Sequence, residues 1–168
     1  MSGIREAIEH LSAGIAAEPA KARAKNAPAT ARLTEGLKCE VTGPRQERVF
    51  TDMPPATGGE GSAPNPGWLL RGAIASCTAT VIAMRAAKLG VALSALEVTV
   101  ETDSDLRGIL GLDEKISAGQ SAVRMKVRIA GDAPPDVLRG MVKWADEHSP
   151  VGCTLRSPPA YAVDIEVG

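Results

Sequence analysis

Residues 65–90, NPGWLLRGAIASCTATVIAMRAAKLG, predict one long helix. Asn65 is a favourable N-cap, and Pro66 suits the first helical position, where no backbone donor is needed. Gly90 ends the pattern, as glycine commonly does after the last helical turn. No charged side chain occurs over residues 72–84. A helix that is apolar on nearly all sides is expected to be buried on nearly all sides.

Cys77 lies near the middle of this predicted helix among small residues, and Ser76 and Thr78 are its only sequence neighbours that can hydrogen-bond. A free buried cysteine usually behaves as a small hydrophobic residue. A reactive cysteine instead needs a nearby positive charge that stabilises its thiolate. The helix dipole fades within the first turn, so Arg45 or Arg71 would have to supply that charge. From the residues alone, Cys77 is either packing or a nucleophile.

The composition is that of a soluble globular protein with one domain of ordinary size. Of its 168 residues, 44% are hydrophobic and 23% are charged, which excludes a disordered chain. Only 2% are aromatic, so the core must be built from aliphatic residues that bury less area than rings. Such a lean core favours self-association. The net charge of −1, without a basic stripe, gives no sign of a nucleic-acid partner.

The sequence predicts a cytoplasmic protein with no membrane partner and no cofactor. Arg5, Glu6 and Glu9 interrupt the N-terminus, and no apolar region of a secretory signal follows them. The uncharged stretch of the long helix is too short and too rich in small and polar residues to span a bilayer. Three cysteines without C-x-x-C spacing and two histidines without ligand spacing predict neither a disulfide framework nor a zinc site.

The first 30 residues are predicted to form an arm, and residues 31–168 the domain. Residues 3–16 read as an amphipathic helix whose apolar residues share one face: Ile4, Ile8, Leu11 and Ile15. Residues 18–30, rich in Ala, Lys and Pro, read as a linker. We expect the helix to dock on its own domain or on a partner subunit rather than on a membrane.

The remaining patterns predict an α+β fold with antiparallel sheets around long central helices. Strands are predicted over residues 37–41, 48–52, 96–103, 121–130 and 161–167, and a second long helix over residues 132–147. The Gly-Pro turn at residues 43–44 places Arg45 at or just after a hairpin turn. Opposite charges on the outer faces of the third and fourth strands support their antiparallel pairing. The loop of residues 53–65, with three glycines and three prolines, is expected to be irregular.

Cys39 and Cys153 are weaker candidates than Cys77 for a reactive thiol. Cys39 lies on the apolar face of a predicted strand and reads as packing. Cys153 lies in HSPVGCTLRSP, which we expect to be irregular and accessible. A hydrolase built from Cys77, His148 and Asp146 would need groups that meet only in the fold, and no local signature supports it.

The segment APNPGWLLRGAIASCTATVIAMRAAKLG resembles the cysteine helix of the OsmC/Ohr family of hydroperoxide-resistance proteins. The family pattern is N-P-x-x-L, a run of small residues and then the cysteine, and it is met here by Asn65, Pro66, Leu69 and Cys77. The segments TDSDLRGILGLDEK and HSPVGCTL also resemble family members. The similarity runs from about residue 32 to the C-terminus.

This resemblance implies an intertwined homodimer that reduces organic hydroperoxides at two sites in the subunit interface. The thiolate attacks the peroxide to give a sulfenic acid, a second cysteine condenses with it to a disulfide, and an external thiol or dithiol restores the enzyme. Carried over by position, Cys77 is the peroxidatic cysteine. Arg45, in TGPRQERVF, matches the arginine that pairs with the thiolate, and Cys153 is the candidate second cysteine.

Two positions depart from the family pattern. Gly67 stands where a glutamate usually pairs with the arginine, so a carboxylate would have to come from elsewhere, for example from Glu60. The second cysteine of the family normally begins a C-P-x segment. Ser149 stands at that position here, four residues before Cys153. If that segment is helical, Cys153 shares a face with Ser149 and could approach Cys77; if not, an external thiol is needed. The alternative function is non-catalytic binding of a small apolar or electrophilic ligand at the dimer interface.

Overall fold

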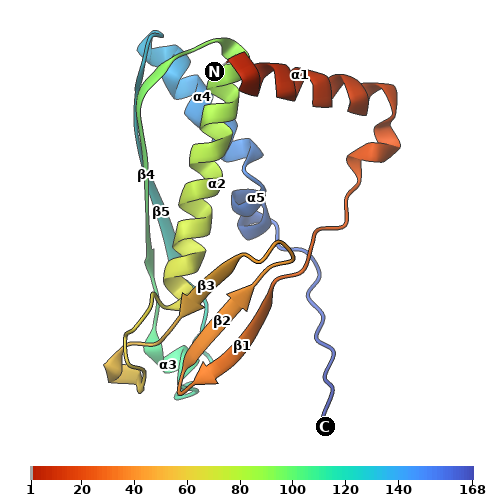
Figure 1. The fold of residues 1–168 in the computed structure, drawn as a ribbon. Coiled ribbons are helices and arrows are strands. Elements are labelled where there is room, and N and C mark those ends of the chain that lie inside the picture. The colour runs from red at the N-terminus through yellow and green to blue at the C-terminus, as the bar shows by residue number, and fades with distance from the viewer. Residues whose placement is uncertain (1) are drawn as a thin grey trace. The chain divides into compact units, whose positions relative to one another are not determined.

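The computed structural model describes residues 2–168 and, over that range, contains five α-helices and two antiparallel sheets (Figure 1). The predicted α+β class is confirmed. The chain divides into two compact units. One is Glu6–Gly72, and the other is Ala73–Gly168 together with the residues up to Arg5. The division falls within α1 (Ser2–Ala17) and α2 (Pro66–Leu89).

The unit Glu6–Gly72 contains a three-stranded sheet of order β1-β2-β3. Its strands are Thr30–Glu35, Lys38–Thr42 and Arg48–Thr51. Cys39 on β2 is half-buried and lies opposite Leu33 on one side and Thr51 on the other. The predicted β2–β3 hairpin is confirmed. Sequence patterns missed β1, because every residue of this edge strand is exposed and no period of two marks it.

The predicted arm helix is confirmed as α1, which is followed by the short 3₁₀ helix Pro19–Ala22. Apolar side chains of α1 remain exposed, with Leu11 at 63%. At the start of the arm, the Arg5 side chain donates a hydrogen bond from Nε to the carbonyl oxygen of Ala87, at 2.9 Å. The same oxygen accepts from the backbone N–H of Gly90 at 3.2 Å, so Arg5 adds a second donor to a carbonyl group at the end of α2.

The loop of residues 53–65 is irregular, as predicted, apart from the 3₁₀ helix Pro55–Thr57. The carboxylate of Asp52, which is 2% exposed, holds the loop together. It accepts hydrogen bonds from the backbone N–H and the hydroxyl of Ser62, at 2.9 and 3.0 Å, and from the backbone N–H of Met53, at 2.7 Å. These donors, the Ser62 backbone first among them, lower the pKa of Asp52.

The predicted long helix is confirmed as α2, 24 residues long. Asn65 caps its start, because its Oδ1 accepts a hydrogen bond from the backbone N–H of Trp68 at 2.8 Å. Gly90 follows its end with a φ of 74°, a left-handed conformation that glycine adopts without strain.

The prediction that α2 is buried on nearly all sides is wrong. Its buried residues form one narrow stripe: Ile74, Thr78, Ile82, Ala86 and Ala87. Other uncharged residues are exposed: Ala73, Ser76, Thr80 and Met84. The physical reason is that a single chain supplies packing partners for one side of this helix only. An uncharged face is therefore left uncovered by the chain itself.

The core of the unit Ala73–Gly168 lies between α2, α4 (Pro135–His148) and the paired strands β4 (Leu93–Asp103) and β5 (Ala122–Gly131) (Figure 1). Its buried cluster comprises Ile82, Ala86, Val91, Leu138, Met141 and Ala145. The predicted antiparallel pairing is confirmed with its charge pattern, since Glu97 lies opposite Arg128 and Glu101 opposite Arg124. The predicted second helix is confirmed as α4.

The loop between β4 and β5 contains the short helix α3 (Leu106–Ile109). Two predictions for the second half of the chain need correction. The segment expected to be irregular around Cys153 forms α5 (Pro150–Arg156). The strand predicted over residues 161–167 is wrong, because the chain after α5 has no regular secondary structure. Alternation of apolar residues makes a strand only where a neighbouring strand offers backbone partners.

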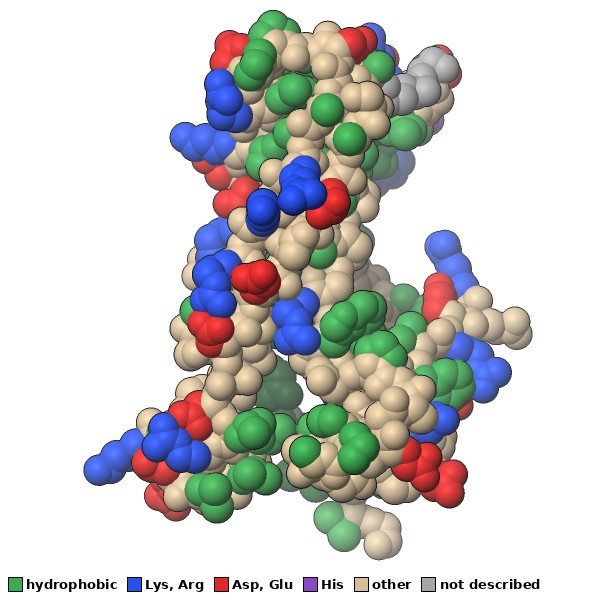
Figure 2. Space-filling view, turned by 90° about the vertical axis from the view of Figure 1, so that its left-hand side faces the viewer, with side chains coloured by type: hydrophobic (Ala, Val, Ile, Leu, Met, Phe, Trp, Pro, Cys, Tyr) green, Lys and Arg blue, Asp and Glu red, His purple; other side chains and the backbone are tan. Residues whose placement is uncertain are grey.

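Apolar side chains reach the surface in many places (Figure 2). In the C-terminal segment, Tyr161 and Val167 are each 91% exposed, and Ile165 is 76% exposed. The buried cluster of the second unit is correspondingly small and aliphatic. This exposure agrees with the lean core expected from a composition almost without aromatic residues.

Candidate active site

A break between two helices sets the geometry of the site. α4 ends at His148 and α5 begins at Pro150. Proline fits the first turn of a helix and keeps the residue before it out of the helical conformation. Ser149 is accordingly extended, with φ of −73° and ψ of 115°. Its Oγ accepts a hydrogen bond from the backbone N–H of Gly152 at 3.3 Å and so caps α5.

The Ser149 hydroxyl also contacts the thiol of Cys77. Ser149 is fully buried, and its Oγ donates a hydrogen bond to the Cys77 Sγ at 3.2 Å. Cys77 lies on α2 one residue before the buried Thr78 and is itself half-buried. The structure therefore presents a partly accessible thiol whose sulfur is held by a buried hydroxyl group. Sequence reasoning singled out Ser149 only as a departure from a family pattern, yet the structure makes it the partner of Cys77.

Cys153 lies one turn further along α5, and its thiol has other partners. The Cys153 Sγ donates to the backbone oxygen of Glu147 at 3.3 Å, and the Arg156 Nη2 donates to that sulfur at 3.6 Å. Cys153 is exposed. The segment is helical, which is the condition under which Cys153 could approach Cys77. The group at hydrogen-bond distance from the Cys77 sulfur, however, is the hydroxyl of Ser149. A resolving role for Cys153 stays a prediction.

Arg45 lies where the sequence predicted, in the tight turn between β2 and β3. Its backbone N–H donates to Oε2 of Glu47 at 2.8 Å, and the next residue, Gln46, has a φ of 64°. The side chain is exposed. Arg45 belongs to the unit Glu6–Gly72, and Cys77 belongs to the other unit. Pairing of the two side chains stays a prediction, as does the use of the exposed Glu60 as their carboxylate.

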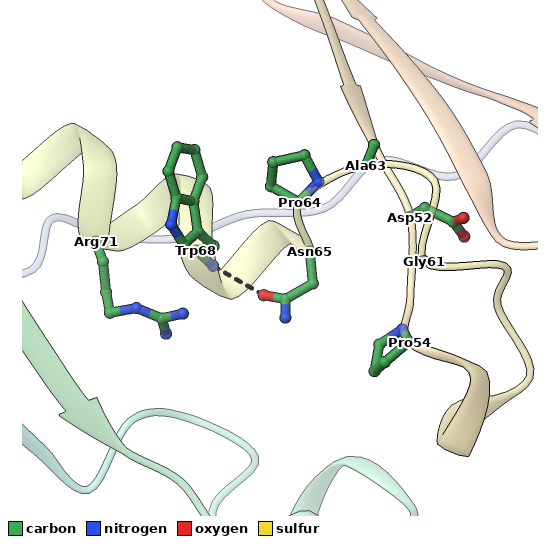
Figure 3. A pocket seen from close by; sticks show the side chains of 8 residues that line it. All are labelled: Asp52, Pro54, Gly61, Ala63, Pro64, Asn65, Trp68 and Arg71. Atoms are coloured by element: carbon green, nitrogen blue, oxygen red, sulfur yellow. Dashed lines mark hydrogen bonds between the residues drawn. The ribbon is translucent and has the colours of Figure 1, made fainter.

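Arg71, the second candidate cation, lines a pocket of about 490 Å³ at the start of α2 (Figure 3). The lining residues are Asp52, Pro54, Gly61, Ala63, Pro64, Asn65, Trp68 and Arg71. Figure 3 shows that Trp68 and Arg71 come from the first turns of α2, whereas Asp52 and Pro54 come from the loop segment before the helix. The pocket combines an indole ring and a guanidinium group with proline surfaces, and it can accept a small ligand that is partly apolar.

A second pocket, of about 420 Å³, lies in the same unit as Cys77. Residues of α2, β5, α4 and α5 line it: Ile74, Thr78, Val123, Met125, Asp146, Gly152, Leu155 and Arg156. Most of this lining is apolar, while Asp146 and Arg156 form an ion pair at 3.1 Å. Thr78 directly follows Cys77 in α2, and Gly152 is the residue whose N–H binds Ser149. An apolar pocket therefore borders the helical turns that carry the thiol and its hydroxyl partner.

His148 and Asp146, the two groups that a hydrolase built on Cys77 would need, each contact other residues. The His148 ring stacks on Trp144 with centroids 4.0 Å apart, and its Nδ1 lies 2.7 Å from the Trp144 backbone oxygen. Asp146 pairs with Arg156. Within residues 2–168, no group of three or more His, Cys, Asp or Glu side chains is arranged to hold a metal ion.

Together, the fold and the site define an α+β protein with a hydrogen-bonded cysteine thiol on its central helix. A sequence model of the family described as OsmC-like protein matches residues 59–164, more than half of the chain. The chain therefore belongs to the OsmC-like family, and the membership inferred from its cysteine helix is confirmed. No curated protein matches the chain.

Solved structures of related proteins have the same fold. An OsmC-like protein from Mycoplasma pneumoniae superposes with a TM-score of 0.68 at 16% identity, over 81% of this chain and 91% of that one. An organic hydroperoxide resistance protein from Legionella pneumophila gives 0.59 at 19% identity, over 80% and 92%. One from Elizabethkingia anophelis gives 0.63 at 17% identity, over 81% and 91%. At such identities the likeness establishes an OsmC-like fold.

Proposed function

We propose that the protein is a thiol-dependent peroxidase that reduces organic hydroperoxides through Cys77. The observation that carries this proposal is the half-buried Cys77 thiol on α2, held at 3.2 Å by the buried hydroxyl of Ser149. A nucleophilic thiol needs both access to its substrate and stabilisation of its thiolate. Family membership supports the proposal, since related structures include proteins named for organic hydroperoxide resistance.

The proposed reaction needs no cofactor. The Cys77 thiolate attacks the outer peroxide oxygen, the O–O bond breaks, and the departing alkoxide takes a proton to become an alcohol. The sulfur is oxidised to a sulfenic acid. An external thiol then condenses with this acid, releasing water and leaving a mixed disulfide, and a second thiol reduces that disulfide to restore Cys77. In this proposal Arg45 stabilises the thiolate and the developing charge on the peroxide.

The apolar pocket lined by Thr78, the residue after Cys77, supports an organic rather than an inorganic peroxide. Its lining includes Ile74, Met125 and Leu155, and its volume is about 420 Å³. Burial of apolar surface contributes about 25 cal/mol per Å², so an alkyl or aryl group would gain binding energy there that hydrogen peroxide cannot gain. We therefore propose substrates in which the peroxide carries an apolar substituent.

We propose that the active form is a cytoplasmic homodimer. The exposed uncharged face of α2 and the exposed apolar C-terminal segment are surfaces that a second subunit would cover. The expectation from sequence that no bilayer is spanned considered only the uncharged residues 72–84, whereas α2 as a whole is long and apolar enough to cross a membrane by length and composition alone. Core helices of soluble proteins pass the same criteria, and the stripe of α2 that includes Ile82 and Ala86 packs in the core.

Oxidation with a single equivalent of peroxide tests the proposed function directly. We expect one equivalent of cumene hydroperoxide to convert the reduced protein to a Cys77 sulfenic acid, with release of one equivalent of alcohol. Dimedone labelling followed by peptide mass spectrometry locates the oxidised sulfur, and Cys39 and Cys153 serve as internal controls. No loss of thiol, or equal labelling of all three cysteines, would contradict the proposal.

Regeneration is expected to proceed through an external thiol. The route through Cys153 requires its sulfur to leave the Glu147 carbonyl and to reach Cys77 past Ser149. We therefore expect peroxide in the presence of a monothiol to give a mixed disulfide on Cys77, detected by non-reducing peptide mapping, and Cys153→Ser to retain turnover. A disulfide between Cys77 and Cys153, with loss of turnover in Cys153→Ser, would instead establish the role of Cys153 that the sequence predicts.

The second candidate function is non-catalytic binding of a small apolar or electrophilic ligand. The apolar pocket lined by Thr78, the residue after Cys77, favours it, as does Gly67 in place of the usual glutamate. On this hypothesis, an apolar electrophile modifies Cys77, while an organic hydroperoxide leaves its thiol reduced. The same mass-spectrometric experiment therefore separates the two functions.

A further inference from the structure

We propose that Ser149 activates Cys77, because its hydroxyl donates the hydrogen bond that stabilises the thiolate and fixes the direction in which the sulfur faces. This inference rests on the proposed function in that it assigns Cys77 as the reactive group. Its consequence, the reactivity of the Cys77 thiol, can be measured without any peroxide. Ser149 is 72 positions from Cys77 in the chain, so only the fold brings them together.

The other contacts of Ser149 leave its hydroxyl proton available for this hydrogen bond. A serine hydroxyl has one proton to donate and two lone pairs that accept. The Ser149 Oγ accepts from the N–H of Gly152 at 3.3 Å, and the Ser149 backbone oxygen accepts from the N–H of Cys153 at 2.8 Å. Neither contact uses the hydroxyl proton, which is therefore available to the Cys77 sulfur, and a Cys77 thiolate, having no proton of its own, can only accept it. Two of the three contacts anchor Ser149 to the first turn of α5, and the third holds the thiol.

Burial increases what this donor contributes. Ser149 is 0% exposed, so no water competes for its proton. Hydrogen bonds to charged groups are stronger than those between neutral groups, and the difference grows where the local dielectric constant is low. A donor of this kind favours the thiolate over the thiol. The helix dipole of α2 contributes little, because Cys77 lies about three turns from its positive end.

A hydroxyl at this position also differs chemically from a thiol. It cannot condense with a sulfenic acid to form a disulfide, so the donor stays in place while Cys77 is oxidised and reduced. After oxidation, the same hydroxyl can donate to the new sulfenic oxygen, which replaces the sulfur as the acceptor nearest to it. Ser149 therefore serves as a fixed donor throughout the proposed cycle.

The experiment must separate this role from the capping of α5. Ser149→Gly removes the hydroxyl, while glycine is itself well tolerated at an N-cap. Ser149→Thr retains both the cap and the donor. Ser76→Ala is the matched control, because the Ser76 hydroxyl is adjacent to Cys77 in sequence but donates to the Ala73 backbone oxygen at 3.3 Å. All variants carry Cys39→Ser and Cys153→Ser, so that Cys77 is the only thiol.

We expect Ser149→Gly to slow alkylation of Cys77 by iodoacetamide at neutral pH about tenfold, the effect of losing one hydrogen bond to a charged group. The thiolate absorbance at 240 nm should decrease in parallel. Ser149→Thr and Ser76→Ala should both keep the rate of the parent protein. Circular dichroism establishes that each variant is folded, and Ser149→Ala replaces Ser149→Gly in these measurements if the glycine variant does not fold.

An unchanged alkylation rate in the folded Ser149→Gly or Ser149→Ala variant would overturn the inference, as would a rate in Ser149→Thr as low as in Ser149→Gly. The proposed function fails independently of these results. If Cys77 depends on Ser149 for its reactivity but peroxide leaves it reduced, the inference holds and the peroxidase proposal does not. If peroxide oxidises Cys77 equally in all variants, the peroxidase proposal holds and the inference does not.

Discussion

Replacement of Cys77 by serine is expected to reduce the rate of organic hydroperoxide consumption by about a thousandfold or more, to the rate of the thiol donor alone. The physical reason is that a serine hydroxyl, with no base beside it, is hardly ionised at neutral pH and is a far weaker nucleophile than a thiolate. The change replaces one sulfur atom with an oxygen at a half-buried position, so the fold should survive. Coupled assays with a dithiol donor measure the rate.

Two controls accompany this variant. Cys39→Ser changes a half-buried cysteine on β2 and should leave the rate within about twofold, as should the substitution of the exposed Cys153 if an external thiol regenerates the enzyme. Retention of activity in Cys77→Ser would reject the proposed nucleophile whatever the other variants do. Loss of activity with an altered circular dichroism spectrum would instead require the milder change Cys77→Ala, for which we expect the same loss.

Substitution of Ile82 by alanine is expected to lower the free energy of unfolding by about 2–5 kcal/mol. Ile82 is 0% exposed and lies at the centre of the cluster that joins α2 to α4. The truncation removes three methylene-sized groups from a core almost without aromatic residues, where few neighbours can move to fill the cavity. Urea denaturation followed by circular dichroism measures the change.

Ile109→Ala is the matched control, since it makes the same chemical change at a residue that is 60% exposed on α3. We expect it to alter the free energy of unfolding by no more than about 0.5 kcal/mol. Equal effects of the two substitutions would contradict the assignment of the core. A stability that rises with protein concentration in both variants would show that subunit association contributes to it.

Local patterns were sufficient to predict much of the fold. The Asn-Pro pair and the following glycine marked both ends of α2 correctly, because caps depend on neighbouring residues alone. The charges of Glu97 and Arg128 indicated the antiparallel pairing of β4 and β5, because side chains on paired strands face one another in register. The same kind of pattern failed over residues 161–167, where apolar alternation exists without a neighbouring strand.

The candidate site was predicted only in part. Cys77 was identified from the helix that carries it, a contiguous stretch of sequence. Its contact with Ser149 joins α2 to the break between α4 and α5, and no local pattern reports which distant side chain meets the sulfur. For the same reason, the sequence could not decide whether Ser149 or Cys153 contacts the Cys77 sulfur, since both residues share a segment and only packing decides which one faces α2.

Helix ends, strand periodicity and the position of Cys77 on its helix thus follow from the order of residues, because each depends on neighbours within about one turn or one strand pair. The burial of one stripe of α2 rather than its whole circumference follows from how many elements one chain can pack against that helix. The hydrogen bond between Ser149 and Cys77 likewise exists only once α4 and α5 are packed beside α2. These features depend on contacts between distant segments, and the folded structure alone supplies them.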